Sequence, residues 1–168
     1  MRMRAARALQ ALVLSLLLFA AAFGTHEVMH LLVLYGVGGH GSIIVRPWHL
    51  SLVNATVDSL HVQPDQPIGP GRQLLVNVMG PVLAGLTLAV LLLYVRERVV
   101  RVALVANVAI LAFYALIEGG DHLLDAVGDF DAGILTSPEF NYGVPLLIIL
   151  VAALSLFRHT TDVQVATG

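Results

Sequence analysis

The amino-acid sequence predicts an all-α integral membrane protein with four transmembrane helices and a small β-prone surface insertion between the first two. Apolar residues make up 58% of the 168-residue chain and charged residues only 12%, whereas soluble domains carry about a quarter charged residues. Apolar stretches long enough to cross a bilayer recur along the chain. A stretch rich in β-branched residues and proline lies between the first two of them. We expect a single domain over residues 1–168.

The four helices are expected at about residues 8–37, 74–95, 102–120 and 141–157. The basic N-terminus followed by apolar residues is also typical of a secretory signal peptide. The apolar run resumes beyond a short polar interruption. We therefore expect that this segment is not cleaved and forms a spanning helix. The interval 42–70 contains short β-prone runs bounded by prolines, which predicts a hairpin-like insertion at the membrane surface.

Composition excludes several classes of function. The formal net charge is −2 and the chain has no Lys, which argues against a nucleic-acid partner, since nucleic-acid binding calls for a basic face. It also has no Cys, which excludes disulfides and thiolate metal sites. Any metal must therefore be bound by His, Asp or Glu.

The arginines indicate an orientation in the membrane. Seven of the nine would fall on one side of a four-helix topology, and the positive-inside rule assigns that side to the cytoplasm. We therefore expect an integral, multi-pass protein with both termini cytoplasmic. The seven are Arg2, Arg4, Arg7, Arg96, Arg98, Arg101 and Arg158.

A His-Glu-x-x-His string lies inside the first apolar run. His26 and His30 are four residues apart, so on a helix their side chains project from one face. Two such imidazoles can bind one Zn²⁺ ion, and Glu27 can act as general base on a metal-bound water. Ionisable residues inside a spanning segment are costly and usually functional. The string therefore predicts a zinc site within the membrane.

Polar residues on three helices recur at one depth. His26 lies 19 residues after Arg7, the last arginine of the N-terminus. Asn77 lies 19 residues before Arg96, and Asp121 lies 20 residues after Arg101, the first and last arginines between the second and third helices. At about 1.5 Å per residue, all three sit roughly 28–30 Å from the arginine-rich rim. We expect them to form one site toward the outer leaflet.

The third zinc ligand should come from the ionisable cluster at that depth on the third helix. Asp121 is the first choice, because the paired glycines 119–120 would let the helix unwind and turn the carboxylate inward. His122 is the second choice and Glu118, one turn deeper, the third.

Other polar residues have weaker assignments. Asn77 can donate a hydrogen bond to a developing oxyanion, which makes it a candidate catalytic residue, or it can simply bond two helices together. The insertion histidines, His40, His49 and His61, are expected to face solvent.

Taken in order, these motifs resemble the site-2 protease family of intramembrane zinc metalloproteases. The resemblance rests on the His-Glu-x-x-His string in the first core helix, on Asn77 with Gly80 and Pro81 opening the next, and on Asp121 late in a third. One difference is the Gly-Asp-His setting of Asp121, where the family usually has Leu-Asp-Gly.

The resemblance implies zinc on His26, His30 and Asp121, with Glu27 as the base. It implies an endopeptidase that cleaves a transmembrane protein partner in contact with membrane lipid. Three other interpretations stay open. One is a non-enzymatic zinc carrier or sensor that uses the same ligands, and another is a structural subunit whose polar residues only hold helices together. The third keeps the enzyme but changes its substrate to a lipid or a small amide.

Overall fold

The computed structural model is mostly helical, and its helices are the expected ones. It describes residues 2–45, 49–50, 55–56, 60–127 and 137–158. The helices are α1 (Arg2–Gly36), α2 (Pro70–Tyr94), α3 (Arg98–Val127) and α4 (Pro138–Arg158). Three of them are long and apolar enough to cross a bilayer, while the apolar part of α4, Phe140–Leu156, is shorter.

The largest departure from the predicted boundaries concerns α3. The expected helix ended near residue 120, but α3 continues as far as Val127. The glycine pair 119–120 therefore does not unwind the helix. A Cβ on Gly119 would lie 2.7 Å from Cγ2 of Val78, so this glycine allows α2 and α3 to approach closely instead.

The predicted insertion contains a small antiparallel sheet. Strand β1 (Gly41–Val45) pairs with β4 (Leu60–Pro64), with Ile43 opposite Val62. Between them the short strands β2 (His49–Leu50) and β3 (Ala55–Thr56) also pair. Gly38 makes the turn from α1 into β1 with a φ of 79°, a conformation that is easy only for glycine.

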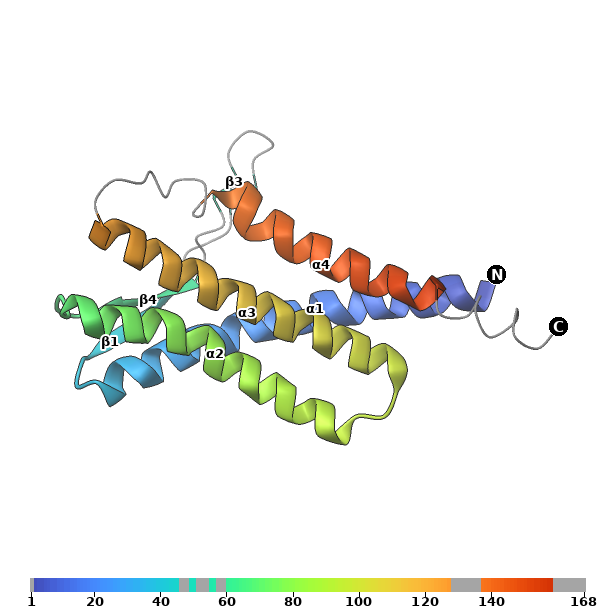
Figure 1. Cartoon of the computed structure of the whole chain (residues 1–168), viewed down its shortest axis with the longest axis horizontal. Coiled ribbons are helices and arrows are strands. Elements are labelled where there is room, and N and C mark those ends of the chain that lie inside the picture. The colour runs from blue at the N-terminus through green and yellow to red at the C-terminus, as the bar shows by residue number, and fades with distance from the viewer. Residues whose placement is uncertain (1, 46–48, 51–54, 57–59, 128–136, 159–168) are drawn as a thin grey trace.

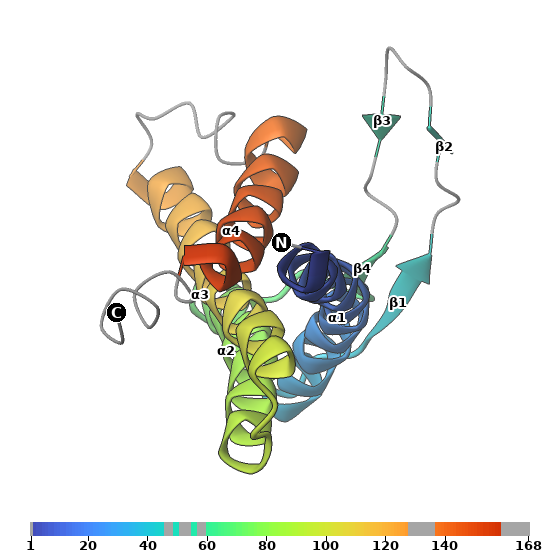
Figure 2. The same ribbon diagram turned by 90° about the vertical axis from the view of Figure 1, so that its right-hand side faces the viewer.

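The helices α1 and α3 form the centre of the bundle. Helix α2 packs against both of them on one side, and α4 packs against both on the other (Figures 1 and 2). The start of α1, the turn between α2 and α3, and the end of α4 lie at one end of the bundle, and β1 and β4 lie at the other (Figure 1). The sheet thus covers the end of the bundle where the polar residues gather.

Small side chains bring the helices close together. Ala22, Ala84 and Leu111 form one buried cluster between α1, α2 and α3. Small residues allow such close packing in membranes, where apolar burial alone gives little driving force. Buried Asn107 donates from Nδ2 to the Ala103 carbonyl at 2.9 Å and to the Ser15 carbonyl at 3.2 Å, which ties α3 to α1.

Candidate metal centre

A pocket of about 330 Å³ lies between the helices beneath β4. Its walls come from α1, α2, α3, the start of α4 and the strand itself. His26, Asn77 and Asp121, the three residues matched by depth, all line it. The depth count therefore identified residues that share one pocket.

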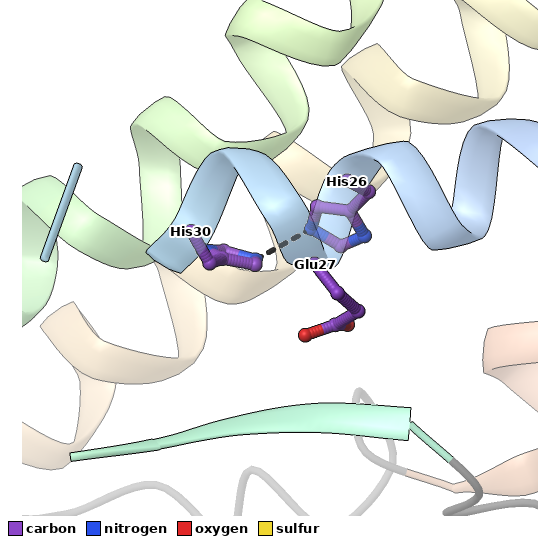
Figure 3. Close-up of side chains that lie close together, drawn as sticks. All are labelled: His26, Glu27 and His30. Atoms are coloured by element: carbon purple, nitrogen blue, oxygen red, sulfur yellow. Dashed lines mark hydrogen bonds between the residues drawn. The ribbon is translucent and has the colours of Figure 1, made fainter. Parts of the chain in front are cut away.

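The two histidines of α1 are buried side by side. His26 is 2% and His30 7% exposed, although both sit in a helix that is long enough to cross a membrane. Their Nε2 atoms are 2.6 Å apart (Figure 3). The i, i+4 spacing thus places the two nitrogens at one point, as the motif predicts.

The backbone of α2 fixes the orientation of the His30 ring. Its Nδ1 donates a hydrogen bond to the Val76 carbonyl at 2.8 Å. Because a carbonyl can only accept, the proton must be on Nδ1, and Nε2 of a neutral ring is left with a free lone pair. Such a bond to the second ring nitrogen is typical of histidines that bind metals.

Gly80 provides the space for that ring. An added Cβ would overlap the imidazole of His30, with Nδ1, Cε1 and Cγ as its nearest atoms. The Gly80-Pro81 motif therefore forms one side of the candidate metal centre, since only glycine lets α2 pass this close to His30.

Gly80→Ala should lower zinc affinity about 10- to 100-fold, the usual effect of disturbing a ligand's supporting contacts. The methyl group would push His30 away from the Val76 carbonyl. Zinc titration of the detergent-purified protein measures the effect. Gly85→Ala in the same helix is the matched control, because its Cβ would meet only Leu111 Cβ at an ordinary 3.5 Å. Equal affinity in the two folded variants would contradict this role for Gly80.

Glu118 on α3 completes the cluster. One carboxylate oxygen lies 3.2 Å from His26 Nε2 and the other 3.1 Å from His30 Nε2. Sequence reasoning ranked this residue third, behind Asp121 and His122, yet its carboxylate contacts both imidazoles. Two imidazole nitrogens and a carboxylate that converge in this way need a shared positive charge, either a proton or a metal ion.

The separations can be compared with those of a zinc site. Two ligands about 2.0–2.1 Å from a tetrahedral zinc lie about 3.3 Å apart. Both contacts of Glu118 are close to that value. The distance between the imidazoles is shorter and would have to widen by about 0.7 Å. The donor set, two nitrogens and one carboxylate, is one that catalytic zinc uses.

The His26 ring is held by aromatic neighbours. It stacks on Tyr114 with ring centroids 5.9 Å apart and an interplanar angle of 18°. Phe23 meets it edge-on at 6.2 Å. His26 Nδ1 is buried and has no hydrogen-bond partner in the part of the chain that the structure describes. Packing, rather than a second hydrogen bond, therefore orients this imidazole.

Tyr114 also ties the site to α4. Its hydroxyl donates to the Asn141 carbonyl at 2.8 Å. Pro145 stands four residues after Asn141 and has no N–H, so the normal helical donor for that carbonyl is missing. The tyrosine supplies the missing hydrogen bond and at the same time packs against a candidate metal ligand.

Glu27 lies beside the two imidazoles but projects toward the strand (Figure 3). Ligand atoms of His26, Glu27 and His30 all lie within 4.8 Å of one another. The carboxylate of Glu27 accepts a hydrogen bond from the backbone N–H of Val62 in β4. The insertion therefore covers Glu27 directly.

A neighbour fixes the orientation of Asn77. Gln73, one turn earlier on α2, donates from Nε2 to Asn77 Oδ1 at 2.7 Å. The amide oxygen of Asn77 is thus occupied, and its NH₂ group remains as the donor of a side chain that lines the pocket. This arrangement suits a residue that donates to a developing negative charge.

The other predicted residues have mixed placements. Asp121 lines the pocket three residues beyond Glu118. Neither residue belongs to the group of described residues that could hold a metal ion, which is His26, Glu27 and His30. The side chain of His122 and that of His49 lie outside the described residues. His40 is exposed, as expected. His61 of β4 was also expected to face solvent, but it is half-buried and lines the pocket.

In comparisons with known proteins, no family model, no curated protein and no solved structure matches this chain.

Proposed function

We propose that the protein is a zinc-dependent endopeptidase of the site-2 protease type that cuts a transmembrane partner within or beside the bilayer. The observation that carries the proposal is the meeting of two imidazoles and a carboxylate from α1 and α3 within 3.2 Å, inside helices apolar enough to span a membrane. In this proposal α4 is a fourth span, both termini are cytoplasmic and the pocket lies toward the outer leaflet.

His26, His30 and Glu118 would hold the ion. Glu118 replaces Asp121 as the favoured third ligand, because its carboxylate contacts both nitrogens. When bound, zinc supplies Lewis acidity that activates water and polarises the scissile carbonyl.

Glu27 is the general base in this mechanism. It lies beside the imidazoles, and its carboxylate is turned toward β4. It takes a proton from the attacking water and returns it to the departing amine, so that the C–N bond breaks with no net gain or loss of protons. Asn77 donates from its NH₂ group to the oxygen that becomes negative.

The covering strand explains how an extended substrate would bind. Strand β4 pairs with β1 along one edge, and the Val62 N–H on the other edge is directed at Glu27. A partner segment that leaves its helical form would pair with this edge by displacing the Glu27 carboxylate from the Val62 N–H, as extended peptides pair with exposed strands. Its carbonyls would then lie beside the metal centre.

Removal of the metal tests the proposal. The purified protein, reconstituted with single-span reporter proteins tagged on both sides of the span, should cleave at least one of them. Cleavage should stop after dialysis against a zinc chelator and return with about one equivalent of Zn²⁺, because the ion supplies the Lewis acid. Mass spectrometry of the fragments locates the cut. Stoichiometric zinc without cleavage of any reporter would favour a carrier or sensor instead.

A further inference from the structure

A second cavity lies at the other end of the bundle from the metal centre. It has a volume of about 590 Å³ and lies between the first turns of α3 and the second half of α4. It shares no lining residue with the metal centre, so the proposed protease function does not account for it.

One half of this cavity is strongly basic. Arg96, Arg98 and Arg101 line it, and all three are exposed. Arg101 Nη1 donates to the Val95 carbonyl at 3.3 Å, which leaves its other N–H groups available. Glu97, the carboxylate of the same turn, accepts the Val100 N–H at 2.8 Å. Among the described residues, no ion pair neutralises these arginines.

The other half is apolar. Val102 and Val105 come from α3, and Val105 is 54% exposed. Ala152 and Ser155 come from α4, and the Ser155 hydroxyl is turned back onto the Ala152 carbonyl at 2.7 Å. This wall therefore presents little polarity to a ligand.

The helices that line the cavity are held together by packing. Ala11, Val99, Ala153 and Leu156 form a buried cluster that joins α1, α3 and α4 at this end of the bundle. The arginines and the apolar wall are therefore held on a common core.

We propose that this cavity binds an anionic phospholipid, with the phosphate against the arginines and one acyl chain along Val102, Val105 and Ala152. Arginine N–H groups match phosphate oxygens in pairs. Basic pockets between membrane helices are suited to anionic headgroups. The apolar wall distinguishes a lipid from free phosphate, because inorganic phosphate has no group to place there.

Native mass spectrometry of the full chain in detergent tests this. Delipidated protein is titrated with phosphatidylglycerol, with phosphatidylcholine of the same acyl chains and with inorganic phosphate. We expect phosphatidylglycerol to bind about 10- to 100-fold more tightly than phosphatidylcholine. Phosphate should compete weakly.

Two variants locate the site. Replacing the three arginines together by Gln should remove the preference for phosphatidylglycerol. Ala152→Trp leaves every charge in place but fills the apolar half, and it should weaken phosphatidylglycerol binding about tenfold or more. The matched control is Arg72→Gln. Arg72 is also an exposed arginine, but it lies in the first turn of α2, whereas the cavity arginines follow the end of that helix.

Three results would overturn the proposal. Equal affinity of the wild type for the two lipids would show that charge plays no part. A preference that survives both variants would place lipid binding elsewhere. Phosphate that competes as well as the lipid, with Ala152→Trp unaffected, would make free phosphate the ligand.

Discussion

Glu27→Gln should lower peptide cleavage by about 10²- to 10⁴-fold, the usual contribution of a general base, while zinc stays near one ion per chain. The amide keeps the size of the side chain but cannot take a proton from water. The three proposed ligands are unchanged, so metal binding should persist. Cleavage is followed with the reconstituted reporter, and zinc by elemental analysis of the same preparation.

This variant also separates the enzyme from its rivals. A carrier or sensor that uses the same ligands would work normally with the Glu27→Gln substitution. Undiminished cleavage would remove Glu27 from the mechanism, and loss of the metal would make it a ligand. His26→Ala serves as the control that loses both metal and activity.

Glu118→Gln should weaken zinc binding by at least about 100-fold, beyond the 10- to 100-fold typical of outer-shell changes. The carboxylate that contacts both imidazoles would become a neutral amide. Asp121→Asn is the matched variant, three residues away in the same pocket. It should change zinc affinity by no more than the roughly 10- to 100-fold typical of a residue outside the ligand set.

Competition with a fluorescent zinc chelator measures both variants. Circular dichroism confirms that each retains its helices. The reverse order of effects would restore Asp121 as the ligand, as the family resemblance implies. Loss of zinc from both variants would indicate that the two carboxylates share the ion.

Much of the fold could be predicted because the apolar runs and their breaks are strong signals. The i, i+4 spacing of His26 and His30 was enough to place both side chains on one face of the helix, while the neighbours of the two rings fix their orientations. The order of the candidate third ligands depended on the glycine pair 119–120. Whether such a pair unwinds depends on its neighbours, and here Val78 on α2 fills the space beside Gly119.

A helical pattern that places Glu118 on the same face as Asp121 was present in the sequence. Tyr114, Glu118 and Asp121 stand at i, i+4 and i+7, a spacing that puts three side chains on one face of an unbroken helix. On α2 the same i, i+4, i+7 spacing relates Gln73, Asn77 and Gly80. No comparable rule predicts where His61 lies, because the path of the insertion over the bundle depends on tertiary packing.

The division of the proposed ligands between α1 and α3 has a consequence during biosynthesis. His26 leaves the ribosome 92 residues before Glu118, an interval of about 5–20 s at ordinary rates of translation. Throughout that interval the nascent chain has its histidines and Glu27 but not the carboxylate from the third helix. If the proposed function and ligand set hold, a hydrolase built in this order would stay inert until most of its own membrane insertion is complete, which would protect both the unfinished polypeptide and the translocation machinery around it.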